Sequence, residues 1–365
     1  MVRGTGQAGR LAYEPDYAVP PGATLLETIQ ALGIDQKEFA RRTGYTEKHI
    51  SHVIQAKAGI TPEAALRFEK VTQVPARFWN NLETQYREQL ARLESRHQAG
   101  SQLDWLKQIP VQELVSRKEI PPCATKVELL EAALVFFGVA SVAAWRIGWT
   151  KHQIAFRRSA TIPGVDGAIA AWVRMAERQA QQVACEAFDE ARFRAALKEI
   201  RELTVNTPAE FVPQMKRLCG ACGVAVVFVP EIPKAPVNGA TRWLNKTRAM
   251  IAVNLRGKSN DRFWFTFFHE AGHVLNDDRT QVFVDVSNYV DDPREKAADE
   301  FAAGLLIPPR YMGRLATLKS RVQVQRFAAE LRIHPGIVVG RLQHEGILPR
   351  THLNGLKAKL VWASG

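Results

Sequence analysis

The sequence has little of what secreted, disulfide-stabilised or membrane-spanning proteins require. It holds four cysteines in 365 residues, too few for a disulfide framework in a chain of this length. No uninterrupted apolar run reaches the ~18 residues that cross a bilayer. The segment before Gly22 lacks the apolar stretch of a signal peptide. We therefore expect a cytoplasmic protein with no membrane partner.

Several chemical signatures are missing as well. The sequence contains no phosphate-binding loop, no Ser/His/Asp nucleophile motif and no repeat of solenoid length. Cys219 and Cys222 form one CxxC pair, but a zinc knuckle would need a second pair of ligands. We interpret these two cysteines as small buried residues. The absences argue against a nucleotide hydrolase, a serine hydrolase and a repeat protein.

Positive charge is what the chain has in excess. Its net charge is +12 and its pI is about 9.7, which fits a polyanionic partner such as DNA, although excess charge also favours solubility. The 46% hydrophobic content is sufficient for two or three domains, each with its own core. Because of the Gly, Pro and charged residues among residues 1–20, we expect this segment to form a flexible arm.

Two short helices joined by a glycine turn are predicted near the N-terminus. Asp35 is placed to cap a helix over 36–42, Gly44 to end it, and Thr46 to cap a second helix over 47–55. A helix-turn-helix has this arrangement, and its second helix enters the DNA groove. A small helical bundle without a nucleic-acid role would show the same pattern. If the helix binds DNA, its groove-facing side chains are Glu47, Lys48, His49, Ser51 and His52.

Residues 35–86 read DQKEFARRTGYTEKHISHVIQAKAGITPEAALRFEKVTQVPARFWNNLETQY. This segment resembles the Cro/C1-type DNA-binding domain in the version found in HigA-type antitoxins. The resemblance implies a five-helix domain that binds a double-stranded operator as a homodimer. It also implies a phosphate contact for Gln36 and base contacts for Glu47, Lys48 and His52. With the remaining positions of the turn and helix, the candidate DNA-binding residues are Gln36, Thr46, Glu47, Lys48, His49, Ser51 and His52.

A second motif lies in the C-terminal half, in the stretch WFTFFHEAGHVLNDD, where His269, Glu270 and His273 spell H-E-x-x-H. On a helix with ~100° per residue, the apolar side chains fall within ~60° of Ala271, and the two histidines lie on the opposite side, ~40° apart. Because the apolar stripe is complete without them, they are placed as two ligands of one metal ion. Glu270 is placed to take a proton from a water held by that metal.

Two further patterns surround this helix. Before it, residues 224–230 and 239–255 have the β-branched, alternating pattern of three strands, with a turn at Asn245 and Lys246. After it, REKAADEFAAGLLIPP predicts a second helix that contains Glu295 in an E-x-x-A-D arrangement like that of gluzincin metallopeptidases. Catalytic zinc usually has three protein ligands, and Glu295 is our candidate for the third. An acid in the first turn of a helix is also favoured by the helix dipole alone.

The sequences NGATRWL, DRFWFTFFHEAGHVL and EKAADEFAAGLLIP together resemble the ImmA/IrrE family of metallo-endopeptidases. The resemblance implies zinc bound by His269, His273 and Glu295, catalysis by Glu270, and cleavage of Cro/C1-type repressors. This chain departs from the family at two places. Many members have a histidine shortly after the H-E-x-x-H helix, where this chain has residues 276–278, and many have an acid at the position of Ala297.

We therefore predict a mainly α protein with a small α+β, gluzincin-like zinc-peptidase domain. The predicted parts are a flexible arm (1–20), a Cro/C1-type DNA-binding domain (21–85), a helical connector (86–205), the peptidase domain (206–315) and a C-terminal helical, helix-turn-helix-like tail (316–365). The tail is expected to pack against the peptidase domain, with His334 and His344 as capping or surface residues. The predicted function is a transcriptional regulator with a zinc endopeptidase domain. The alternative is a HigA-like antitoxin that represses its operon and neutralises a toxin.

Overall fold

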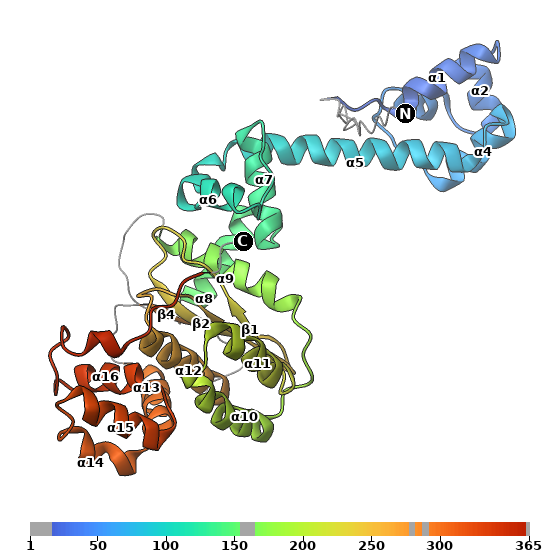
Figure 1. Ribbon diagram of the computed structural model, residues 1–365. Coiled ribbons are helices and arrows are strands. Elements are labelled where there is room, and N and C mark those ends of the chain that lie inside the picture. The colour runs from blue at the N-terminus through green and yellow to red at the C-terminus, as the bar shows by residue number, and fades with distance from the viewer. Residues whose placement is uncertain (1–16, 154–164, 277–281, 287–291, 363–365) are drawn as a thin grey trace, which may run out of the picture. The chain divides into compact units, whose positions relative to one another are not determined.

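The structure is a computed structural model and describes residues 17–153, 165–276, 282–286 and 292–362. It is mostly helical with one small sheet, which confirms the predicted fold class. The chain forms two compact units that divide between Gln102 and Leu103. Figure 1 traces the elements in chain order by colour.

The described residues of the first unit form five helices, as predicted: α1 (Pro21–Ala31), α2 (Gln36–Thr43), α3 (Glu47–Ile54), α4 (Pro62–Thr72) and α5 (Ala76–Gly100). Both predicted caps are formed. The Glu38 backbone N–H donates to Asp35 Oδ1 at 2.7 Å, and the His49 backbone N–H donates to Thr46 Oγ1 at 3.2 Å. Gly44 ends α2 with a φ of +74°, a left-handed conformation that favours glycine.

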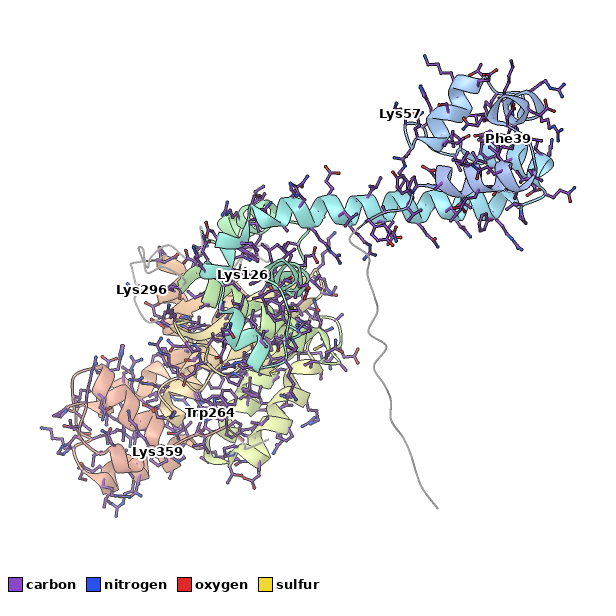
Figure 2. The ribbon with its side chains drawn as sticks, turned by 90° about the horizontal axis from the view of Figure 1, so that it is seen from above. Phe39, Lys57, Lys126, Trp264, Lys296 and Lys359 are labelled. Atoms are coloured by element: carbon purple, nitrogen blue, oxygen red, sulfur yellow. The ribbon has the colours of Figure 1, made fainter. Side chains whose placement is uncertain are left out.

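The apolar faces of these helices meet in one aromatic core. The Phe68 ring lies 5.3 Å from the ring of Phe39, which is labelled in Figure 2, and 6.0 Å from the Trp79 ring, measured between centroids. Ile50 and Val53 of α3 are buried in the same core. Since one side of α3 is used for this packing, the helix has a single polar side left for a partner.

The second unit contains the remaining helices and all four strands. The helical segments are η1 (Leu103–Gln108), α6 (Val111–Ser116), α7 (Lys126–Phe137), α8 (Val142–Gln153), α9 (Val165–Gln181), α10 (Glu190–Glu202), η2 (Leu203–Val205), α11 (Pro208–Gly220), α12 (Asn260–Asn276), α13 (Pro293–Leu306), η3 (Pro309–Tyr311), α14 (Met312–Leu315), α15 (Arg321–Leu331), α16 (Pro335–His344) and η4 (Asn354–Leu356).

The sheet has the order β1-β3-β2-β4, with β1 (Val224–Phe228), β2 (Val237–Asn245), β3 (Arg248–Val253) and β4 (Val282–Val286). The three predicted strands are confirmed, and β4 is an addition that the sequence did not reveal. β1 runs parallel to β3, whereas β2 is antiparallel to both of its neighbours, β3 and β4. β2 is therefore an inner strand.

Two helices cover opposite faces of this sheet. Successive residues of a strand point to opposite faces, and Thr241 of β2 contacts Glu270 of α12, while Arg242 forms an ion pair with Glu177 of α9. α9 lies within the segment predicted to be a connector, so that segment also supplies part of the sheet's cover. The domain boundaries that we predicted at residues 20, 85, 205 and 315 remain a prediction.

One core joins α12 to the C-terminal helices. Phe211 of α11 packs against Trp264 of α12, with 4.8 Å between ring centroids. α15 and α16 add Val324, Phe327, Leu331, Ile337 and Val338 to the same cluster, which confirms that the tail packs on this unit. Cys219 and Cys222 are buried there as well, as we interpreted them.

By length and composition alone, the stretch Lys126–Gly148 could cross a membrane. Its most apolar 18 residues have a mean hydropathy of 1.9, and 22% of them are buried. It is not one helix. Gly138, with a φ of +69°, ends α7 before α8 begins. A helix of twelve residues is about 18 Å long at 1.5 Å per residue, and the hydrocarbon core of a bilayer is ~30 Å thick. Neither helix alone is long enough to span it.

Candidate functional site

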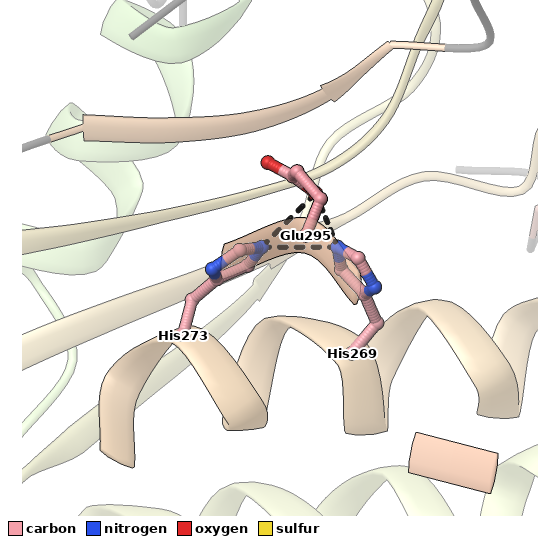
Figure 3. Close-up of side chains that lie close together, drawn as sticks. All are labelled: His269, His273 and Glu295. Carbon is pink, nitrogen blue, oxygen red and sulfur yellow. Dashed lines mark hydrogen bonds and ion pairs between the residues drawn. The ribbon is translucent and has the colours of Figure 1, made fainter. Parts of the chain in front are cut away.

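The H-E-x-x-H motif lies on α12, and its two histidines project toward the same point. His269 and His273 are one helical turn apart, and their Nε2 atoms lie 3.0 Å from each other. Glu295 projects from α13 toward the same point, with Oε2 at 3.1 Å from His269 Nε2 and 3.3 Å from His273 Nε2. Figure 3 shows the three side chains converging. The structure therefore brings together all three predicted metal ligands.

The close approach of α13 to α12 depends on small residues. A Cβ atom added at Gly272 would lie 3.1 Å from the Ala298 Cα atom, so the two helices touch almost backbone to backbone. The start of α13 is fixed by Asp292, whose carboxylate accepts from the Arg294 backbone N–H at 2.9 Å. The same carboxylate bonds to the Arg294 side chain, which lowers the pKa of Asp292.

Burial of the histidines differs from the sequence-based expectation. We expected them to point away from the core. Each is nonetheless only 2% exposed, and Glu270 is fully buried. The helical wheel considers α12 alone and cannot show that α13 and β2 cover its polar side.

Asp299 is a site residue whose role the sequence did not reveal. Its Oδ1 atom lies 2.8 Å from His269 Nδ1. When Nε2 binds a metal ion, the ring's proton is on Nδ1, which donates it to the Asp299 carboxylate. Asp299 is the last residue of the E-x-x-A-D arrangement, and the spacing of one helical turn from Glu295 was the available signal.

Glu270 is held by β2, through a contact that no local pattern indicated. The Thr241 hydroxyl lies 2.7 Å from Glu270 Oε2 and 2.9 Å from the Glu270 backbone carbonyl, and it donates its proton to one of these acceptors at a time. Gly239 lies two residues earlier on the same face of β2. A Cβ atom there would lie 2.6 Å from Glu270 Oε1, so glycine leaves the space that the carboxylate occupies.

The three converging atoms suit a zinc ion. Zinc bonds to histidine nitrogen and carboxylate oxygen at ~2.0–2.2 Å, and tetrahedral geometry then separates neighbouring ligand atoms by roughly 3.3–3.5 Å. The observed separations of 3.0, 3.1 and 3.3 Å are close to this. These residues are also the one group of potential ligands that meets within the described residues. Two imidazoles and one carboxylate leave a fourth position for water, as in catalytic zinc sites.

The neighbouring strand and the neighbouring acids have structural partners of their own. Residues 239–243 of β2 are not free to bind an extended substrate by edge pairing, because β3 and β4 pair with both edges of this strand. Three aspartates near Glu295 in the sequence are other potential ligands; of these, Asp292 caps α13 and Asp299 contacts His269. The third, Asp291, lies outside the described residues.

The predicted DNA-binding residues occupy the exposed side of α2 and α3. Gln36, Thr46, Glu47 and Lys48 are exposed, whereas His49, Ser51 and His52 are half-buried. Three of the seven already have structural contacts. Thr46 caps α3, the His49 ring stacks on Tyr45 at 4.4 Å, and Ser51 Oγ accepts from the Gln55 amide at 3.1 Å. Glu47, Lys48 and His52 are therefore the side chains of α3 that remain as candidates for base contacts.

Comparison with known families identifies two domains. Residues 25–79 match the helix-turn-helix family, and residues 222–343 match the IrrE N-terminal-like domain, a peptidase family. The chain contains both domains. The H-E-x-x-H helix and Glu295 lie inside the second match, and α3 lies inside the first. This agrees with both resemblances inferred from the sequence.

Two solved structures are similar to part of the chain. One is an antidote protein of a plasmid maintenance system from Nostoc punctiforme, with 26% identity. The other is an addiction module antidote protein of the HigA family from Coxiella burnetii, with 22% identity. Each alignment covers 23% of this chain and 92% of the other, with a TM-score of 0.22. No curated protein matches.

Proposed function

We propose that the protein is a cytoplasmic transcriptional regulator that binds operator DNA as a homodimer and acts as a zinc-dependent endopeptidase. The observation that carries the peptidase proposal is the convergence of His269, His273 and Glu295 beside Glu270. A structural zinc site usually has four protein ligands. Three ligands next to a buried carboxylate suit a catalytic site better.

His269, His273 and Glu295 would hold the zinc ion. Zinc, when bound, supplies a Lewis acid that polarises a peptide carbonyl and makes water more acidic. Asp299 keeps the His269 ring in the tautomer that offers Nε2 as a ligand. Glu270 acts as the general base that accepts the proton of the attacking water and returns it to the leaving amine.

The position of the base is fixed by β2. The Thr241 hydroxyl contacts Glu270 Oε2, and Gly239 leaves room for Oε1. A general base must lie within hydrogen-bond reach of the proton that it takes, and a displacement of ~1 Å can reduce the rate by ~100-fold. Thr241 and Gly239 thus serve as positioning residues for Glu270.

For the substrate we propose a repressor of the Cro/C1 type. The resemblance to ImmA/IrrE peptidases supports this, because that family is implied to cut such repressors. The helix-turn-helix domain at the other end of the chain would bring the peptidase to the operators where such repressors bind.

The test compares two variants of the zinc-loaded full-length protein. Glu270→Gln should retain zinc and DNA binding but lose cleavage, because no base remains. Glu295→Ala should lose most of its zinc as well as cleavage, because three ligands share one ion. New peptide termini in cell extract, read by mass spectrometry, report cleavage, and metal analysis reports zinc. Glu300→Gln is the control, because this exposed acid lies on the same helix.

One outcome would replace the peptidase proposal with the antitoxin alternative. In that outcome no cut depends on zinc and Glu270, while Glu270→Gln still represses its promoter and neutralises a toxin encoded beside it. The zinc site would then be structural or silent.

A further inference from the structure

The positive charge of the protein is concentrated at its C-terminal end. Residues 307–362, here named the C-terminal module, contain ten Lys and Arg and two Glu, a net charge of +8 out of the chain's +12. Residues 17–102, which include the helix-turn-helix, contain eleven Lys and Arg and nine Asp and Glu, a net charge of +2. The excess that suggested a polyanionic partner is therefore found mainly outside the recognised DNA-binding domain.

Some cations of the C-terminal module have structural partners. Arg314 forms a bidentate pair with Glu330 at 2.7 and 2.8 Å, and Lys357 pairs with Asp261 at 2.6 Å. Arg341 pairs with Glu345 at 2.6 Å. Each of these pairs stabilises the module or fixes it to α12, so these residues are accounted for by the fold.

Other cations are exposed, and no carboxylate of the described residues forms an ion pair with them. They are Arg310, Lys319, Arg321, Arg326, Arg350 and Lys359. Arg321 does not stabilise α15 through its charge, because it lies in the first turn of this helix, where the helix dipole disfavours a cation.

Several of these cations lie near the start of α15. Lys319 and Arg321 flank its N-cap, Ser320. A Cβ atom added at Gly355 would lie 4.0 Å from the Arg321 guanidinium, so Arg321 lies beside η4. The Asn354 amide in turn donates to the Arg350 carbonyl at 2.9 Å, which holds Arg350 near the same turn. Arg321 and Arg350, about thirty residues apart in the sequence, thus belong to segments that meet at η4.

The rigid attachment of the module limits how this surface can bind. Ile337, Val338 and Val339 at the start of α16 are buried, and α16 packs against α12. The position that would read bases in a helix-turn-helix is therefore occupied by the protein's own core. The module therefore exposes positive charge but no helix that could enter a DNA groove. A surface of this kind contacts phosphates rather than base edges.

We infer that the C-terminal module is a second DNA-contacting surface, which binds the phosphates of duplex DNA without regard to sequence. It would add affinity to the specific binding of α3 and keep the peptidase unit on the DNA. Duplex DNA is favoured over other polyanions because the same chain contains a helix-turn-helix, and tethering two DNA-binding surfaces raises the effective concentration of the second.

The test measures the salt dependence of full-length protein binding to a fluorescent random-sequence duplex. The double variant Arg321→Ala/Arg326→Ala should reduce the slope of log K against log salt by ~0.9 for each phosphate contact removed. The charge-retaining variant Arg321→Lys/Arg326→Lys should keep the slope. The matched control is Lys198→Ala/Arg217→Ala, which removes two exposed cations from α10 and α11 and should leave the slope unchanged.

Three outcomes would overturn the inference. The first is an unchanged slope in the alanine variant, and the second is an equal reduction in the control. The third is a reduction for single-stranded or double-stranded RNA but not for duplex DNA. The test is also separate from the operator assignment, because Lys48→Ala should change discrimination between sequences, whereas the module variants should weaken binding to all duplexes alike.

Discussion

The candidate recognition helix α3 and the candidate metal site differ in how far apart in the sequence their parts lie. The candidate base contacts of α3 lie within six residues, from Glu47 to His52. The metal site combines Gly239 and Thr241 of β2 with α12 and α13, up to Asp299. A helix presents side chains through its own periodicity, whereas a site built from three elements depends on tertiary contacts. Substitutions should therefore act locally in α3 and at long range in the metal site.

The largest effect of this kind is expected at Gly239, which is 30 residues from His269 in sequence. In Gly239→Ala the new Cβ atom meets Glu270 Oε1 at 2.6 Å and Thr266 Cγ2 at 2.7 Å, so the base or the strand must move. We expect zinc to be retained and the cleavage rate to fall by ~100-fold, the scale of a 1 Å displacement. Gly304→Ala is the control, because nothing lies within 4 Å of its added Cβ atom. Equal activity of the two variants would contradict the positioning role.

Asp299 provides a second test of the comparison, because it contacts the proposed ligand His269 but is not itself a proposed ligand. Asp299→Asn removes the carboxylate that accepts from His269 Nδ1. Loss of such a partner typically weakens metal binding by ~10–100-fold, and competition with a zinc chelator measures it. The neighbouring exposed acid allows a matched comparison, since Glu300→Gln should bind zinc like the wild type. If the two variants do not differ, Asp299 has no role in orienting the ligand.

In α3 the expected effect is smaller and confined to DNA binding. Lys48→Ala and His52→Ala should each weaken binding to the operator by ~1–3 kcal/mol if these side chains contact bases. A duplex that carries the promoter of the protein's own gene is the probe, at fixed salt. Lys70→Ala removes an exposed cation from α4 instead and serves as the control. An unchanged footprint in both α3 variants would show that Lys48 and His52 do not contact the operator. A change in the zinc content of either variant would show that the substitution acts beyond α3.

The smallest effect concerns pH and the C-terminal helices. The side chain of His334 accepts from the Gly336 backbone N–H at 3.0 Å, caps α16 and lies 2.7 Å from the Asn260 amide. Burial lowers the pKa of His334, while Asp261 acts in the opposite direction. The unfolded chain therefore binds a proton more readily than the folded one. The stabilising contribution is present above the ordinary histidine pKa of ~6.5 and is lost as the pH falls below it.

Urea unfolding at neutral and acidic pH measures this contribution. His334→Asn keeps a capping side chain that does not titrate, so part of the loss of stability on acidification should disappear, by ~0.5–2 kcal/mol, the worth of a cap. His344→Asn, at an exposed position on the same helix, is the control substitution. The same acid dependence in His334→Asn and the wild type would show that the cap does not depend on protonation.

What could be predicted from the sequence follows the same division. Asp35, Gly44 and Thr46 gave the helix-turn-helix because caps and glycine turns act over three or four residues. The H-E-x-x-H spacing and the E-x-x-A-D arrangement gave the proposed ligands because each motif lies on one helix. Thr241 was missed because its contact with Glu270 spans 29 residues and depends on the packing of β2 on α12. β4 was missed as well, and with it the fact that β2 is an inner strand.

A structure of the full-length protein with zinc bound, together with zinc-edge X-ray absorption, tests the central claim most directly. The claim predicts one zinc per chain, held by His269 Nε2, His273 Nε2 and a Glu295 oxygen at ~2.0–2.2 Å, with the fourth position taken by water near Glu270. A fourth protein ligand that closes the site would contradict the claim. So would zinc bound elsewhere, for example by sulfur ligands at ~2.3 Å.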